Sequence, residues 1–153
     1  MKKNQMISVR EADQADLNEV CNMLAELFSI EDDFRPDYEK QKTALEILID
    51  KKTGSIILVA ESDGYIAGMV NLQKIVSTAS GGYSILLEDL YVKPEYRKTG
   101  IGGMLVGKAE EWGRSESALR IQLAADGRNR RAVSFYSYAG FGKSNMILHY
   151  KYL

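Results

Sequence analysis

Residues 87–103 read Leu87-Glu88-Asp89-Leu90-Tyr91-Val92-Lys93-Pro94-Glu95-Tyr96-Arg97-Lys98-Thr99-Gly100-Ile101-Gly102-Gly103. The pattern indicates an apolar strand, a short loop and a glycine-rich helix start. The first backbone N–H groups of a helix have no partners within the helix, and the helix dipole adds positive potential there. An anionic group can therefore dock on the main chain, and glycines let it come close. The segment predicts a phosphate-binding loop.

Two common nucleotide-binding motifs come close to this segment, and each fails at one residue. A P-loop ends in Gly-Lys followed by Ser or Thr, whereas Gly107-Lys108 is followed by Ala109, which has no hydroxyl for magnesium. A dinucleotide fingerprint requires a third glycine where Leu105 stands, and it normally lies in an opening βαβ unit. Both motifs are therefore disfavoured.

The remaining pattern, Arg-x-x-Gly-x-Gly after a strand ending in Leu-Tyr-Val, resembles the GNAT superfamily of acyl-CoA-dependent N-acetyltransferases. A second segment also resembles this superfamily, because Asn129 precedes a stretch that bears Phe135-Tyr136 and closes in Gly140-Phe141. Many family members have Gly directly after the Arg, whereas this chain has Lys98. The segment Leu-Glu-Asp-Leu-Tyr-Val at residues 87–92 resembles a segment of the diamine and polyamine acetyltransferase branch of this superfamily.

The resemblance implies a single α/β domain over residues 1–153. Its GNAT-like fold would have a mixed, largely antiparallel sheet of about six or seven strands, with one parallel pair splayed to admit CoA and about four flanking helices. Hydrophobic spacing and turn residues independently favour this order of elements. They predict strands at 6–10, 55–61, 65–75, 83–92 and 118–124, two closing strands within 141–153, and helices near 13–28, 37–51, 100–113 and 129–140.

The strand at 83–92 and the strand at 118–124 are joined by the predicted helix at 100–113. Such a strand–helix–strand unit is normally parallel with a right-handed crossover. The two strands should therefore be neighbours with their carboxyl ends at one edge, where open α/β sheets bind ligands.

Amide formation from a thioester requires a neutral amine, so a base must accept a proton near the reacting nitrogen. Glu88 and Asp89 are the candidates, and adjacent strand residues point to opposite faces unless a bulge intervenes. The resemblance implies that Glu88 is the base, while a solvent-facing acid is the alternative reading. Asp89 is predicted to be structural, although the choice between Glu88, Asp89 and a water chain stays open.

A thiolate leaving group benefits from a proton donor, and the resemblance implies Tyr136 for this role. Without the resemblance, Tyr136 and Val133 would be read as the buried face of a short helix. A backbone N–H near Leu90 could stabilise the charge that develops on the acetyl oxygen.

Acetyl-CoA is the cosubstrate that the resemblance implies. Main chain at Leu90, Tyr91 and Val92 would hold the pantetheine arm, and Asn129 would contact it. The pyrophosphate would lie on the loop and the helix start, comprising Arg97, Lys98, Thr99, Gly100, Ile101, Gly102 and Gly103.

Composition allows such an enzyme and disfavours several other classes of protein. The 153 residues are 45% hydrophobic with a net charge of −1, which argues against disorder and against a nucleic-acid partner. The single His149 has no second His or Cys near it, so no metal site is expected, and Cys21 is expected to be a buried hydrophobe. Residues 1–5 carry no apolar signal core and no apolar run could span a bilayer, so a cytoplasmic protein without membrane association is expected.

The sequence therefore predicts an N-acetyltransferase that moves an acetyl group to a primary amine of a small molecule by direct attack in a ternary complex. The acceptor could be a polyamine, an aminosugar or an amino acid, and a homodimer is compatible with this function. The acidic residues 31–33 could favour a cationic acceptor or form a solvated loop. An acyl-CoA-binding sensor module and an acetyltransferase for protein N-termini or lysines are the alternatives.

Overall fold

The computed structural model describes residues 6–153, so the expectation about residues 1–5 lies outside the described part. The chain divides into two compact units, one up to Gln122 and one from Leu123 to Leu153, and each is described by itself. Within the described residues, no helix has both the length and the apolar character needed to cross a membrane.

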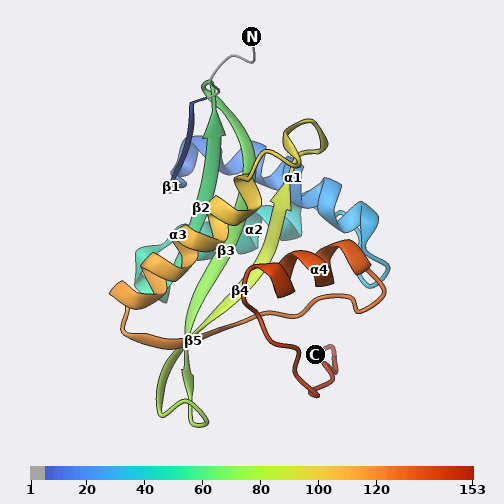
Figure 1. Cartoon of the computed structure of the whole chain (residues 1–153). Coiled ribbons are helices and arrows are strands. Elements are labelled where there is room, and N and C mark those ends of the chain that lie inside the picture. Colours follow the sequence, from blue (N-terminus) through green and yellow to red (C-terminus); the bar gives the residue numbers. More distant parts are fainter. Residues whose placement is uncertain (1–5) are drawn as a thin grey trace. The chain divides into compact units, whose positions relative to one another are not determined.

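The first unit contains a five-stranded sheet with the order β1-β2-β3-β4-β5 (Figure 1). Neighbours from β1 to β4 are antiparallel, whereas β5 runs parallel to β4. The predicted parallel pair, made by a crossover through one helix, is therefore confirmed. The strands are β1 (Ile7–Glu11), β2 (Ser55–Ser62), β3 (Tyr65–Ser77), β4 (Gly82–Val92) and β5 (Ala118–Gln122).

Three α-helices belong to the first unit, namely α1 (Leu17–Ile30), α2 (Tyr38–Ile49) and α3 (Ile101–Ser115). Figure 1 shows α1 and α2 behind the sheet and α3 across its front. Three short 3₁₀ turns, η1 (Gln14–Asp16), η2 (Lys51–Thr53) and η3 (Pro94–Tyr96), connect elements. The second unit contains α4 (Arg130–Tyr138), so the four predicted helices are confirmed.

Side-chain caps define where the first helices begin. Asp13 accepts a hydrogen bond from the Ala15 N–H, and Asp16 accepts one from the Asp13 N–H, which forms a capping box at η1 before α1. Arg10 of β1 donates to Asp16 at 2.7 Å and holds the pKa of Asp16 below its usual value. At α2, Asp37 caps the helix through the Lys40 N–H, as expected from its position.

The main core lies between α1, α2 and one face of the sheet. On the helices it includes Val20, Met23 and Leu45, which are fully buried, and on the strands Val59 and Met69. Cys21 belongs to this cluster as a buried free thiol, which confirms its predicted hydrophobic role. Burial of this face fixes α1 against β3 and β4, and α2 against α1 and β2.

The opposite face of the sheet carries α3 in close contact with the strands. A Cβ on Gly68 of β3 would stand 2.8 Å from the Tyr91 carbonyl oxygen, 3.2 Å from Leu105 Cδ1 and 3.3 Å from Ile101 Cγ2. A side chain there would push α3 away from the sheet, because close-packed interiors have no spare space. Gly68 therefore sets the distance between the first turns of α3 and the end of β4.

The predicted six or seven strands are wrong, because the described residues contain five. The missing strands are the two predicted within 141–153, where no strand forms. A strand requires a hydrogen-bonded neighbour, and none pairs with this segment among the described residues. Its large apolar side chains are exposed, including Met146 at 91% and Tyr152 at 83%. The alternating pattern alone therefore does not supply the partner strand that a strand needs.

Candidate active site

A β-bulge interrupts the pairing of β3 with β4 at the two predicted acids. Asn71 lies opposite Glu88 and Met69 lies opposite Tyr91. One residue of β3 therefore faces two residues of β4, and the first of these, Asp89, has φ +54°. The strained backbone of Asp89 changes the alternation of side chains along β4.

The bulge brings both carboxylates to one face of the sheet. Asn71 Nδ2 donates to Asp89 Oδ2 at 2.7 Å, and Gln73 Nε2 donates to Glu88 Oε2 at 3.4 Å. Because Asn71 and Gln73 are two residues apart on β3, their side chains share a face, and so do the acids that they contact. Glu88 and Asp89 can therefore act at the same site.

The two acids differ in their exposure. Glu88 is exposed to solvent, whereas Asp89 is half-buried. Burial raises the pKa of Asp89 to about 6, opposed by the hydrogen bond from Asn71 and assisted by the nearby charge of Glu88. A half-buried carboxylate with a raised pKa in a cleft is typical of a functional site.

Asp89 also lines a pocket between the two N-terminal helices and the sheet. The pocket has a volume of about 170 Å³, and most of its wall is apolar. Its lining residues are Leu24 and Phe28 of α1, Lys40, Gln41, Ala44, Leu45 and Leu48 of α2, Asn71 of β3 and Asp89 of β4. Small-molecule sites commonly combine apolar walls with a few convergent polar groups.

Asn71 was missed by the reasoning from sequence. It is 1% exposed, its Nδ2 donates to Asp89, and its Oδ1 has no hydrogen-bond partner among the described residues. A lone Asn within the apolar strand Tyr65–Ser77 was the available signal, because a buried amide needs partners. The sequence does not show that Asp89 is that partner, because this contact depends on the bulge.

The end of β4 is anchored to α1 by two polar contacts. The Tyr91 hydroxyl donates to Glu26 at 2.6 Å, and Lys93 pairs with Glu19. Burial, together with the bond to Glu26, raises the pKa of Tyr91 to about 12. Because the Tyr91 side chain lies in the core, only its main chain can serve the predicted cofactor role.

Beyond Leu86, β4 continues without β5 beside it. The last parallel pair is Leu86 with Gln122, and β4 runs on to Val92. This edge of β4 therefore has no strand partner among the described residues. Leu90 and Val92, both half-buried, lie in this stretch.

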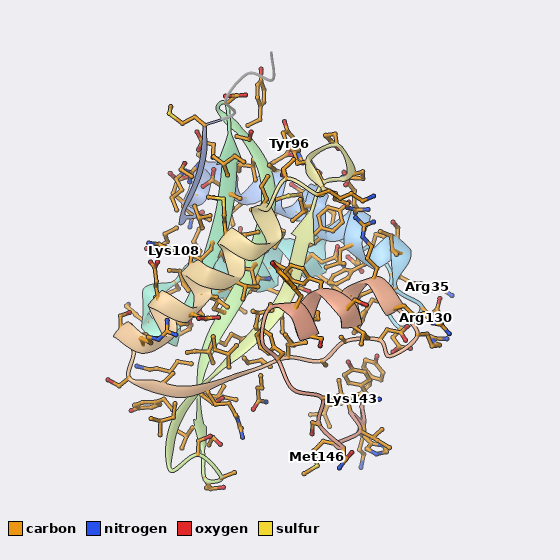
Figure 2. The ribbon with its side chains drawn as sticks, viewed as in Figure 1. Arg35, Tyr96, Lys108, Arg130, Lys143 and Met146 are labelled. Carbon is orange, nitrogen blue, oxygen red and sulfur yellow. The ribbon has the colours of Figure 1, made fainter. Side chains whose placement is uncertain are left out.

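The predicted phosphate loop connects β4 to α3, and Figure 2 labels Tyr96 within it. Arg97 Nε donates to the Val92 carbonyl at 2.8 Å, and its guanidinium lies 5.4 Å from the centre of the Tyr91 ring. Lys98 and Thr99 are exposed, and Lys98 has φ +63°. Arg97 thus holds the start of the loop, and Lys98 is the more exposed cation.

The N-terminus of α3 has the form expected for an anion site. Gly100 is the N-cap residue with φ +90°, and no side chain caps the helix there. Ile101 is 1% exposed, so its side chain packs inward and only its N–H can reach a ligand. The uncapped amides of Ile101, Gly102 and Gly103 can donate to an anionic group.

Asn129 and Tyr136 belong to the second unit. Asn129 Oδ1 accepts from the Ala132 N–H at 3.0 Å and caps α4. The half-buried Tyr136 ring contacts the Phe135 and Phe141 rings edge-on, at centroid distances of 5.3 and 5.7 Å. The helix ends at Tyr138, and Gly140, with φ +92°, follows the C-cap residue Ala139.

The described residues contain no group of three or more His, Cys, Asp or Glu side chains that could hold a metal ion. His149 is exposed and lies after α4.

Known proteins resemble this chain in sequence and in fold. It is 32% identical over 96 residues to the uncharacterized N-acetyltransferase YhfO of Bacillus subtilis, covering 63% of this chain and 64% of that protein. The chain is 26% identical to the thialysine N-epsilon-acetyltransferase of Mus musculus, over 86% of this chain and 82% of that protein. The chain is 30% identical to the spermidine N(1)-acetyltransferase of Thermoplasma acidophilum, over 80% of this chain and 76% of that protein.

Among solved structures, aminoglycoside N-acetyltransferase AAC(6')-Iy in complex with CoA matches with a TM-score of 0.85. Sequence identity is 14%, and the match covers 99% of this chain and 98% of that chain, so it shows the shared fold. The model of the acetyltransferase (GNAT) family matches residues 17–141, which include the loop between β4 and α3 and also helix α4. This chain is therefore an acetyltransferase of the GNAT family.

Proposed function

We propose that this protein transfers the acetyl group of acetyl-CoA to a primary amine of a small molecule, with both substrates bound together. The observation that carries the proposal is the course of β4. This strand leads from two carboxylates on one face, past an edge that has no strand partner within residues 6–153, to the uncapped N-terminus of α3. Similarity to acetyltransferases named for thialysine and spermidine supports a small amine as acceptor.

Acetyl-CoA would supply an acetyl group activated as a thioester. The amides of α3 and Lys98 would bind its pyrophosphate, and main chain at Leu90 and Val92 would orient its extended arm in the manner of an added strand. In the second unit, Asn129 would also contact this arm. The Leu90 N–H would stabilise the negative charge that develops on the acetyl oxygen.

The proposed transfer requires two proton movements. Glu88 would take a proton from the acceptor nitrogen as the new N–C bond forms, and its exposed position allows exchange of that proton with water. Tyr136 would give its phenolic proton to the sulfur as the C–S bond breaks. The products are an N-acetylated amine and the free thiol of CoA. Protonated Glu88 would then give its proton to water and the Tyr136 phenolate would take one from water, so protons and electron pairs balance.

Glu88→Gln should lower kcat/KM at least about tenfold near pH 7, because a protonated amine then has no carboxylate to accept its proton. The deficit should shrink toward the pKa of the acceptor, near 10, where free amine is abundant. Rates measured from pH 6.5 to 9.5 on wild type and variant test this. Parallel profiles without any deficit would remove Glu88 from the mechanism.

Cys21→Ala should leave kcat within about twofold of wild type, because the proposed route has no acyl-enzyme. Cys21 is buried against α2, where its thiol donates to the Tyr38 carbonyl at 3.6 Å, and burial raises its pKa. Steady-state rates and CoA affinity of the variant provide the check. Loss of turnover with intact folding and CoA binding would contradict direct attack.

A panel of acceptors, assayed by release of free CoA thiol, tests the proposed acceptor class. Polyamines, aminosugars and amino acids should include substrates, and peptides with free N-termini or lysines should be poor ones. Strong activity on peptides alone would favour a protein acetyltransferase. CoA binding by calorimetry, with no transfer to any amine, would favour a sensor module.

A further inference from the structure

Gln73 of β3 and Glu88 of β4 are diagonal neighbours in the sheet. Gln73 is paired with Leu86, whereas Glu88 is paired with Asn71, two residues away along each strand. Paired residues of antiparallel strands share a face, and long side chains can reach diagonally across about 7–8 Å. Gln73 makes such a contact, because its Nε2 donates to Glu88 Oε2 at 3.4 Å. The contact therefore joins the two strands on the face that carries both acids.

The two partners in this contact differ in how firmly the sheet holds them. Gln73 is half-buried and lies in the central strand, where it is also paired with Ser55 of β2. Glu88 is exposed, and β5 accompanies β4 only as far as Leu86. A long, exposed side chain samples several rotamers unless a contact restricts it. Gln73 is therefore the fixed partner, and Glu88 is the side chain that the contact restrains.

The contact engages only one oxygen of the carboxylate. Within residues 6–153, Gln73 is the only side chain that donates a hydrogen bond to Glu88, and the bond goes to Oε2. Oε1 receives no side-chain hydrogen bond from these residues. A general base must stand within about 2.6–3.2 Å of the group from which it takes a proton. An amide that holds Oε2 leaves Oε1 available for the acceptor nitrogen.

The charges near Glu88 make a neutral donor suitable for this role. Asp89 places a second carboxylate beside Glu88, and the two negative charges repel each other. Lys74, the next residue of β3, points to the opposite face and pairs with Glu116 at 2.7 Å. A cation beside a carboxylate would weaken it as a base, because it favours the charged form. The Gln73 amide can orient Glu88 without adding a charge.

We propose that Gln73 is a positioning residue for the transfer reaction, which holds Glu88 with one carboxylate oxygen directed toward the acceptor nitrogen. This inference deepens the proposed function and rests on the role of Glu88 as the base. Gln73 itself contacts neither the acceptor nor acetyl-CoA in this arrangement. Its effect on the reaction must therefore pass through Glu88.

A double-mutant cycle of Gln73→Met and Glu88→Gln tests this dependence at pH 7.5, with 1,4-diaminobutane as the acceptor. Methionine keeps the length of the side chain and removes the donor. In the wild-type background, Gln73→Met should lower kcat about fivefold and leave KM for the amine within about twofold. In the Glu88→Gln background, the same substitution should change kcat by less than about 1.5-fold, because the interaction is already lost.

Gln122→Met is the matched control for the loss of an amide from the same face. Gln122 lies opposite Leu86 on β5, and its Oε1 accepts from Arg120 instead of contacting an acid. Its kcat should stay within about twofold of wild type. Equal losses of kcat in Gln73→Met and Gln122→Met would overturn the specific role of Gln73. A fivefold loss that persists in the Glu88→Gln background would overturn it as well.

Two further measurements show whether the loss of kcat has a merely structural origin. The Tm of Gln73→Met should stay within about 2 °C of wild type, because a solvent-exposed hydrogen bond adds little to stability. The Kd of CoA should stay within about twofold, because Gln73 lies outside the loop between β4 and α3. A loss of kcat that appears only together with a large fall in Tm would assign Gln73 a structural role and overturn the proposal.

A spectroscopic readout that needs no turnover separates this inference from the proposed function. The side-chain amide protons of Gln73, assigned by NMR through their loss in Gln73→Met, should lie downfield in wild type and move upfield in Glu88→Gln, because a hydrogen bond to a carboxylate is strong. This change without acetyl transfer by wild type would support the contact and contradict the function. Acetyl transfer with unchanged Gln73 signals in Glu88→Gln would support the function and overturn the role of Gln73.

Discussion

Tyr136→Phe should lower kcat by about a hundredfold or more while the Kd of CoA stays within about twofold of wild type. The substitution removes one hydroxyl and keeps the ring, whose edge-on contacts with Phe135 and Phe141 position it after the first turn of α4. The phenolic proton would otherwise neutralise the leaving thiolate. Single-turnover rates and CoA titrations measure the two quantities separately.

Tyr138→Phe is the matched control, because Tyr138 lies two residues further along α4 and is 94% exposed. It should turn over acetyl-CoA at the wild-type rate. Equal rates in wild type and Tyr136→Phe would show that another group, or water, protonates the sulfur. A loss of CoA affinity that matches the loss of rate would instead assign Tyr136 to cofactor binding.

Gly68→Val should reduce the free energy of unfolding by about 3 kcal/mol and weaken CoA binding as well. The added Cβ would meet the Tyr91 carbonyl oxygen at 2.8 Å, and backbone cannot move aside as a flexible side chain can. Either β4 or α3 must shift, and both flank the phosphate loop. Urea denaturation and CoA titration of the purified variant test the two effects.

Gly107→Ala is the control for this change. Gly107 is exposed within α3, and a Cβ there would meet nothing within 4 Å. Alanine is a better helix former than glycine, so stability should rise by up to about 1 kcal/mol. If Gly68→Val were as stable as wild type, the tight contact between β3, β4 and α3 would not position the loop as described.

The order of elements and the course of the chain around β4 could be predicted from sequence. Apolar spacing identified the strands and helices, and the crossover rule placed the strand at 118–124 parallel to the strand at 83–92. The start of α3 was also predictable, because Gly100 follows a loop with Arg97 and Lys98. These features depend on local patterns that the chain carries within a few residues.

The geometry of the two acids could not be predicted in the same way. Strict alternation would separate Glu88 from Asp89, and only the bulge at Asp89 brings both to one face. Nothing in the residue pattern shows which of the two is the less exposed. Asn71 and the raised pKa of Asp89 emerge only from the pairing of β3 with β4 and the packing of α1 and α2 over it.

The segment 141–153 illustrates a second limit. Its apolar residues alternate well enough to favour strands, but a strand is defined by its partner, and the described residues provide none for it. Local pattern therefore predicts the capacity to form a strand, whereas pairing depends on the surrounding structure.

The central claim is that a small amine receives the acetyl group directly while acetyl-CoA is bound. The most direct measurement is the yield of N-acetylated product and of free CoA from acetyl-CoA and 1,4-diaminobutane, determined by mass spectrometry and thiol titration. We expect one mono-acetylated diamine for each CoA released, with no release when the amine is omitted. Release of CoA without acetylated amine, or no reaction by a protein that binds both ligands, would contradict this account.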